Sequence, residues 1–185
     1  MRDYRINSNY AKALFMLADE LGEQEQVCKD MRLVRRVCVE NRELNVVFDN
    51  PEIKADKKVS ILAALFGDHV GRTVMAFLAF VARKKRAVNL KGISTRYLEI
   101  YRDSRGIVLS HLTTAYPADD AAKELAGRIV SGYAGKEVEM ESATDPKVIG
   151  GFSLEFDNMM LDATFATQLA RLRRQFEENV YESKL

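Results

Sequence analysis

The most informative stretch of the chain reads Asp145-Pro146-Lys147-Val148-Ile149-Gly150-Gly151-Phe152, with Asp162 and Thr164 shortly after it. Paired glycines weaken a strand intrinsically, so they indicate a bulge or a place where another backbone segment comes close. Apolar and polar residues then alternate from Phe152 to Asp157, which predicts a strand that opens on the two glycines. A second apolar run follows at 159–161, and Asp162 or Thr164 can cap a long terminal helix. The stretch therefore predicts a hairpin followed by a helix.

In the residues before this stretch, the spacing between apolar residues changes once along the chain. Up to about residue 105 the spacing is helical, and beyond Arg105-Gly106 it shifts toward strands. We expect a mainly α fold: an N-terminal six-helix bundle over residues 1–105, then a small α+β module with a short sheet and a long C-terminal helix over 106–185. Because the period changes at a glycine, we also expect the two halves to fold separately. The expected elements are helices over 9–22 (capped by Ser8 or Asn9), 27–38, 42–48, 52–66, 71–86 and 90–100, a strand at 107–116, a helix from Pro117 with Leu125 and Ile129 inward, and a strand at 137–142.

Composition narrows the class of protein. Over 185 residues, Lys plus Arg number 28 and Asp plus Glu 27, so no net field favours nucleic acid or an anionic membrane. Cys28 and Cys38 lie ten positions apart in one predicted helix, too far to bridge, which is typical of a reducing compartment. No apolar run approaches the roughly 18 residues needed to span a bilayer. The first five residues lack the apolar segment of a signal peptide, so we expect a bacterial cytoplasmic setting.

No pattern in the chain supports catalysis or cofactor binding. His69 and His111 have no Cys, His or carboxylate at metal-ligand spacing. Nucleophile elbows, phosphate loops and dinucleotide fingerprints are absent from the sequence. The glycine pair is not followed by a helix N-terminus that could cradle a phosphate. We therefore expect no catalytic residue, no cofactor and no metal.

Each of two basic clusters in the sequence has two possible interpretations. The run Arg83-Lys84-Lys85-Arg86 can be a solvated helix end, since cations complement the dipole there, or a contact for an acidic partner or nucleic acid. The group Arg171, Arg173 and Arg174 has the same two interpretations. The balanced charge of the whole chain argues against nucleic acid in both cases.

Two predicted helices carry more apolar surface than one buried face requires. Residues 10–18 are apolar on more than one side, and the helix at 71–86 has a second apolar surface that includes Ala76, Ala79 and Phe80. Small residues let a third helix approach closely. A groove between the first and fifth helices is therefore a candidate site for an amphipathic helix of a partner.

Two separated patterns together resemble one known family. The first is Tyr10-Ala11-Lys12-Ala13-Leu14-Phe15, and the second is Asp145-Pro146, Ile149-Gly150-Gly151-Phe152, then Asp162, Thr164, Leu169 and Leu172. They resemble the δ subunits of F-type ATP synthases, the family of the mitochondrial oligomycin-sensitivity-conferring protein, over essentially the whole chain. The chain departs from the family pattern after Asp162, where Ala163, Thr164 and Ala166 replace the usual Gly-Ser and a following basic residue. Alanine is less suited than glycine to a positive φ, so the turn is expected to differ there.

The resemblance implies a non-catalytic stator component that couples rotation to ATP synthesis. It implies that the N-terminal helices bind N-terminal segments of the α subunits, and that the C-terminal module binds the b subunits of the peripheral stalk. It also implies a peripheral location on the cytoplasmic face of the bacterial inner membrane, without insertion. The alternative is a stand-alone helical adaptor that binds RNA or a regulatory protein. The residues that the resemblance assigns to the α-subunit groove are Tyr10, Ala13, Leu14, Leu17, Ala76, Phe77 and Phe80; those of the structural motif are Asp145, Gly150, Gly151, Asp162 and Thr164; and those of the stalk contact are Phe165, Leu169, Leu172 and Phe176.

Overall fold

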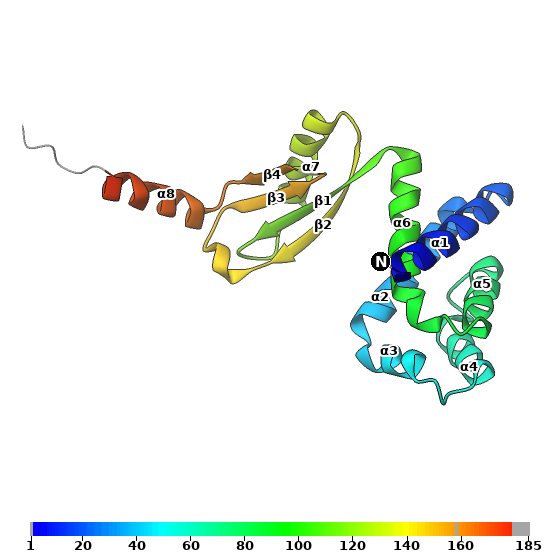
Figure 1. The fold of residues 1–185 in the computed structure, drawn as a ribbon. Helices are drawn as coiled ribbons and strands as arrows, with labels where there is room; N and C mark the ends of the chain where they lie inside the picture. Colours follow the sequence, from blue (N-terminus) through cyan, green and yellow to red (C-terminus); the bar gives the residue numbers. More distant parts are fainter. Residues whose placement is uncertain (1, 158, 179–185) are drawn as a thin grey trace, which may run out of the picture. The chain divides into compact units, whose positions relative to one another are not determined.

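The structure is a computed structural model that describes residues 2–157 and 159–178. The chain divides into two compact units, Met1–Ser104 and Arg105–Leu185. The described residues form a mainly helical fold with eight α-helices, the last of them near the C-terminus, and a small four-stranded sheet (Figure 1). Within residues 2–157 and 159–178, no helix has both the length and the apolar content to cross a membrane.

The N-terminal unit is built from helices whose apolar residues recur every three or four positions. Ala11, Leu14 and Ala18 follow this spacing in the first helix, and all three are buried. The other helices each bury apolar side chains in the same way; Met31, Leu62 and Tyr97 are completely buried. The helices are α1 (Arg2–Glu20), α2 (Gln24–Glu40), α3 (Arg42–Asp49), α4 (Ala55–Phe66), α5 (Arg72–Arg83) and α6 (Leu90–Arg105), with a 3-10 turn at Ala87–Asn89 before α6.

A buried lysine connects α3 to α4. The Lys58 ammonium donates hydrogen bonds to the carbonyl oxygens of Phe48, at 2.7 Å, and of Asn50, at 2.9 Å. These carbonyls lie at the C-terminal end of α3, where a cation is favoured by the helix dipole. The contact satisfies carbonyls that the helix itself leaves without a donor.

The N-terminal half of α1 packs closely on α6. A Cβ atom at Gly92 of α6 would overlap the side chain of Asn7, so glycine permits this approach. One turn before Asn7 in α1, the ring centroid of Tyr4 lies 5.5 Å from the Arg96 guanidinium of α6. Further along α1, the rings of Phe15 and Tyr97 are 6.2 Å apart. These contacts fix α1 along the surface of α6.

The C-terminal unit holds a sheet with strand order β2-β1-β3-β4. Strand β1 (Ile107–Thr114) pairs in parallel with β2 (Glu137–Thr144), and α7 (Asp120–Ala134) makes the crossover between them. Strand β3 (Phe152–Phe156) pairs antiparallel with β1 and with β4 (Met159–Asp162). A 3-10 turn (Pro146–Val148) precedes β3, and α8 (Phe165–Glu178) follows β4. One face of the sheet packs on α7 around a buried cluster of Val108, Leu112, Ala126, Val130, Leu154 and Phe156.

Four sequence-based expectations about these elements were wrong. Helix α1 begins at Arg2, not after a cap at Ser8 or Asn9, because its first turns gain the contacts with α6 described above. Helix α4 begins at Ala55 and not Glu52, since a turn occupies the residues after Pro51. The two glycines precede β3 instead of opening it. Leu125 is exposed, because the positions of α7 that face the sheet are those of Ala126 and Val130.

Candidate functional site

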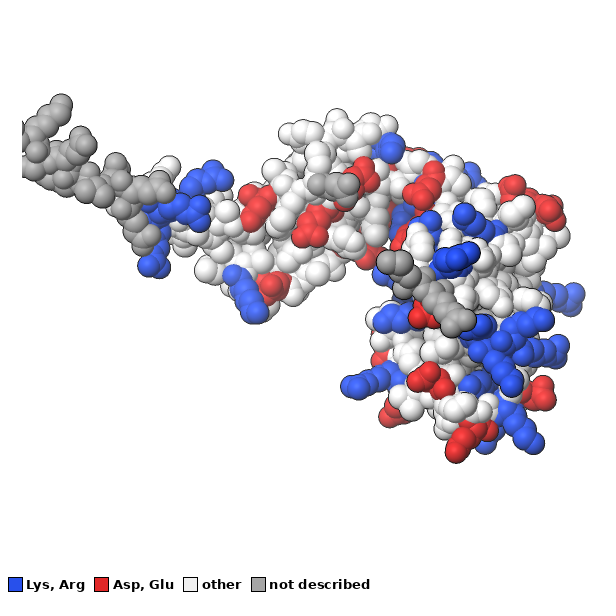
Figure 2. All heavy atoms as spheres, in the orientation of Figure 1, with Lys and Arg blue, Asp and Glu red and all other residues white. Residues whose placement is uncertain are grey.

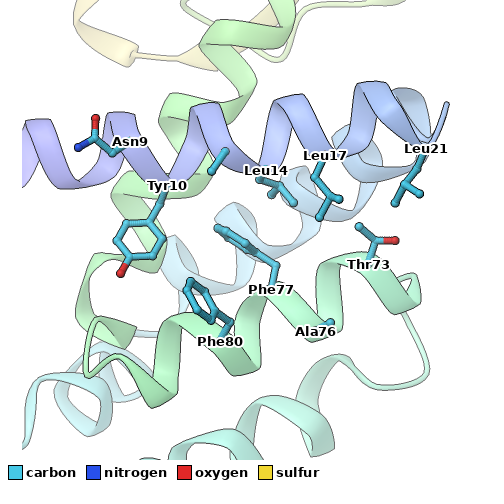
Figure 3. A pocket seen from close by; sticks show the side chains of 10 residues that line it. Asn9, Tyr10, Leu14, Leu17, Leu21, Thr73, Ala76, Phe77 and Phe80 are labelled. Atoms are coloured by element: carbon cyan, nitrogen blue, oxygen red, sulfur yellow. The ribbon is translucent and has the colours of Figure 1, made fainter.

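An apolar groove runs between α1 and α5 (Figure 3). It has a volume of about 600 Å³. Helix α1 contributes residues at the spacing of one helical face, and α5 runs opposite to it with side chains directed toward α1 (Figure 3). The lining residues are Asn9, Tyr10, Ala13, Leu14 and Leu17 from α1, Leu21 directly after it, and Thr73, Ala76, Phe77 and Phe80 from α5.

Three aromatic rings close one end of the groove. The Tyr10 ring lies 6.4 Å from the centroid of Phe77 in an edge-to-face arrangement and 6.2 Å from that of Phe80. Aromatic pairs at these separations are favourable beyond the area they bury. Phe80 remains 49% exposed, so about half of its surface is accessible. This end therefore combines a rigid aromatic wall with an open apolar surface.

All seven residues expected in the groove line it, though not equally. Leu14 is only 1% exposed, so it forms the floor and belongs to the core. Ala13, Leu17, Ala76 and Phe80 are exposed and form the accessible surface. The expectation did not include Asn9, Leu21 and Thr73; the continued helical spacing of Leu14, Leu17 and Leu21 was the signal that could have added Leu21.

A buried carboxylate fixes the start of α5 against α2. Gly71 precedes α5 and has no side chain to cap it. Asp30 supplies a carboxylate instead: it accepts hydrogen bonds from the Gly71 N–H at 2.7 Å and from the Gln26 amide at 2.8 Å. A negative charge at a helix N-terminus is favoured by the helix dipole. This contact sets where α5, and with it one wall of the groove, begins.

The glycine pair brings two backbone segments into close contact. Gly151 has a φ of +76°, and a Cβ atom there would overlap the carbonyl oxygen of Ala163 and lie 3.1 Å from the Cα of Thr164. A Cβ at Gly150 would lie 2.6 Å from the Phe165 ring. Before the pair, the Asp145 carboxylate accepts a hydrogen bond from the Lys147 N–H at 2.9 Å. The turn before β3 is thus fitted against the segment that leads into α8.

Asp162 and Thr164 together begin α8. The Thr164 hydroxyl accepts from the Thr167 N–H at 3.2 Å, which makes Thr164 the N-cap. The Asp162 carboxylate accepts from the Thr164 N–H at 2.9 Å and from the Thr167 hydroxyl at 2.7 Å. The hydrogen bond from the Thr167 hydroxyl, followed by those from Thr164, lowers the pKa of Asp162 below its ordinary value. Ala163 is not among the described residues with positive φ, so the turn forms without glycine at that position.

Helix α8 carries an apolar face that is largely exposed among the described residues. Phe165, Leu169, Leu172 and Phe176 are the residues expected to contact the stalk, and they are exposed by 53%, 58%, 47% and 75%. Strand β4 adds Met159, Met160 and Leu161, which are also exposed. Exposed apolar patches of this kind mark interaction sites in soluble proteins.

The described residues show no arrangement for metal chemistry. Within residues 2–157 and 159–178, no group of three His, Cys, Asp or Glu side chains could hold a metal ion. His111 lies on β1 with its Nδ1 3.5 Å from a carboxylate oxygen of Glu141 on β2.

The two units differ in charge. Lys and Arg outnumber Asp and Glu in the N-terminal unit, and Asp and Glu outnumber Lys and Arg in the C-terminal unit. Many basic side chains project from the visible face of the helical unit (Figure 2).

The comparisons with known proteins agree over almost the whole chain. A family model described as "ATP synthase delta (OSCP) subunit" matches residues 6–176. The chain is 33% identical over 180 residues to "ATP synthase subunit delta" of Cytophaga hutchinsonii, covering 97% of this chain and 98% of the relative. It is 36% identical over 166 residues to the protein of the same name from Chlorobium luteolum, covering 89% and 91%.

A solved structure shares the fold. A chain in the cryo-EM structure of the Toxoplasma gondii mitochondrial ATP synthase hexamer matches with a TM-score of 0.69 at 20% identity, covering 92% of this chain and 97% of that one. At this identity the match concerns the fold alone. With the family match over residues 6–176 and relatives above 30% identity over at least 91% of their length, the chain belongs to the ATP synthase delta (OSCP) subunit family.

Proposed function

We propose that this chain is the δ subunit of a bacterial ATP synthase and serves as a stator link between the catalytic head and the peripheral stalk. As a δ subunit it is a non-catalytic part of the complex and takes part in ATP synthesis through that complex. The six N-terminal helices act in this proposal as one bundle that holds the head. The unit after Arg105 acts as the connection to the stalk.

The observation that carries the proposal is the groove between α1 and α5. A groove of about 600 Å³ lined mostly by apolar side chains matches the apolar face of an amphipathic helix. We assign the N-terminal segment of an α subunit to it. Rotation of the rotor loads this contact continuously, so burial of apolar surface is a suitable basis for it, because salt screens such burial far less than surface ion pairs.

The exposed apolar face of α8 supports the second contact. Leu169, Leu172 and Phe176 share this face, and helices of the b subunits would cover it in the assembled stalk. In this arrangement the subunit lies at the cytoplasmic face of the inner membrane as a peripheral part of the complex. The bacterial sources of the relatives are consistent with that location.

Phe80→Asp tests the assignment of the groove. Phe80 contributes half-exposed ring surface beside Tyr10, and burying a carboxylate there under a bound helix is costly. We expect affinity for a synthetic peptide of the α-subunit N-terminus to fall by more than about tenfold in titration calorimetry.

Val46→Asp is the matched control, because Val46 is an exposed apolar residue of α3 outside the groove. This control should keep the affinity of the unmodified chain, and circular dichroism should show both variants folded. An affinity unchanged by Phe80→Asp rejects the groove assignment.

A further inference from the structure

The two ends of the groove carry opposite charges held against its lining residues. At the aromatic end, the Lys84 ammonium lies 5.6 Å from the ring centroid of Phe80. At the other end, the Glu23 carboxylate accepts a hydrogen bond from the Thr73 hydroxyl at 2.7 Å. Phe80 and Thr73 both line the groove. Each charge is therefore placed at the rim by contact with a groove residue.

Neighbouring residues strengthen this difference between the ends. Arg83, Lys85 and Arg86 are exposed beside Lys84, at and just beyond the C-terminus of α5. Glu20 is exposed in the last turn of α1, next to Leu21 at the far end of the groove. Arg72 precedes Thr73 in sequence, and its single positive charge is smaller than the two negative charges of Glu20 and Glu23. The excess positive charge is thus concentrated at the Phe80 end.

The length of the groove limits what can lie in it. From Tyr10 to Leu21 the α1 backbone advances by roughly 16 Å at the usual rise per residue, which is the length of about three turns of a bound helix. A helix of that length spans both charged ends at once. Its end residues would therefore meet Lys84 at one end and Glu20 and Glu23 at the other.

We propose that the groove selects its occupant by charge register: the bound α-subunit helix presents Asp or Glu side chains at the Phe80 end and Lys or Arg side chains at the Leu21 end. This inference rests on the proposed function and specifies the chemistry of the partner at the same site. Apolar burial supplies the affinity, and the rim charges determine which way round and in which register the helix binds. A helix with the opposite charge pattern meets like charges at both ends.

The test uses the full chain and two peptides. One peptide has the sequence of the N-terminal segment of the organism's own α subunit, and the other has every acidic and basic residue exchanged for the opposite charge. The apolar face is identical in both. At low ionic strength we expect the native peptide to bind about tenfold more tightly, because both rim contacts change from attraction to repulsion in the exchanged peptide.

The double variant K84E/E20K reverses one charge at each end of the groove and leaves Arg83, Lys85, Arg86 and Glu23 in place. It should bind the native peptide with a clearly smaller preference over the exchanged one than the unmodified chain does, and high salt should abolish the preference in both proteins. Lys57→Glu, an exposed residue of α4 outside the groove, should leave the preference unchanged. Equal binding of the two peptides to the unmodified chain overturns the charge register and leaves the groove assignment intact. Absence of binding by either peptide overturns the proposed function as well.

Discussion

Replacing Gly151 by alanine tests the close approach between the turn before β3 and the start of α8. The matched change is Gly135→Ala, at the C-terminus of α7 in the same unit. Both glycines have a left-handed backbone, with φ of +76° and +64°. They differ in surroundings: a Cβ at Gly135 meets nothing within 4 Å, whereas a Cβ at Gly151 meets the backbone of Ala163 and Thr164.

The expected magnitudes follow from this difference. An alanine held in the left-handed region costs about 1–2 kcal/mol, and Gly135→Ala should lose only that. At Gly151 the neighbouring atoms belong to the backbone and cannot rotate away. Relieving the overlap must displace the Ala163 N–H from its 2.9 Å hydrogen bond to the Phe152 carbonyl and disturb the cap at Thr164. These losses add about 2 kcal/mol, so Gly151→Ala should cost about 3–4 kcal/mol in total.

Urea denaturation of the full chain, followed by circular dichroism, measures both variants. The transition that moves in Gly135→Ala identifies unfolding of the C-terminal unit, and Gly151→Ala should move the same transition about twice as far. In thermal unfolding the difference between the variants should be on the order of 10 °C for a unit of this size. Equal losses in the two variants would show that the segment leading into α8 is not packed against Gly151, and the account of the glycine pair would be wrong.

Three further predictions concern the cap, a buried thiol and the two units. Thr164→Ala should lower the free energy of unfolding by about 1 kcal/mol in urea denaturation, since it removes the N-cap of α8, and Thr164→Ser should restore it. Burial raises the pKa of the Cys38 thiol from 9.0 to about 11, so the unfolded state loses its proton first as pH rises. The contribution of the protonated thiol to the free energy of unfolding is complete below pH 9 and should decline between pH 9 and pH 11. Thiol reagents should modify Cys38 at pH 8 only after the chain unfolds. Rapid modification of the folded chain at pH 8 would contradict the burial of Cys38. Residues 1–105 expressed alone should show a cooperative thermal melt, and a gradual loss of helical signal would count against separate folding of the two halves.

Local patterns in the sequence predicted the parts of the fold that depend on one element at a time. The helical spacing of Val27, Met31, Val34 and Cys38 was sufficient, and all four are buried. The alternation over β3 likewise predicted which side of the strand carries Leu154 and Phe156 to the core. These features follow from the periods of helix and strand, which any single segment displays.

Features that depend on distant contacts were not predictable from the chain. The start of α1 depends on Gly92 and Arg96, more than eighty residues away in sequence, so a local cap at Ser8 looked sufficient. The parallel pairing of β1 with β2 and the strand order require knowledge of how α7 crosses over. Propensity at one site cannot encode such choices.

The groove was partly predictable for a related reason. Two helices with more apolar surface than one core face requires indicated a contact surface, and the resemblance assigned seven of the residues that line it. Its acidic end was not predictable, because Glu23 acquires its position through a contact with Thr73, fifty residues away in sequence. At the basic end the contact is local, since Lys84 lies four residues after Phe80 at the end of the same helix. Membership of the δ subunit family leaves the free-standing adaptor without support.

The two edge strands of the sheet, β2 and β4, differ in how well they resist pairing with an edge strand of another molecule. Strand β2 places Glu137, Glu139 and Glu141 along its length, and repulsion between such rows discourages two edges from joining. Strand β4 is the other edge of the sheet and has no such row before Asp162; it carries the exposed side chains of Met159, Met160 and Leu161. Subunit produced without its stalk partners is therefore expected to self-associate through β4 during purification. A lysine at Met160 is the simplest change to keep such preparations dispersed.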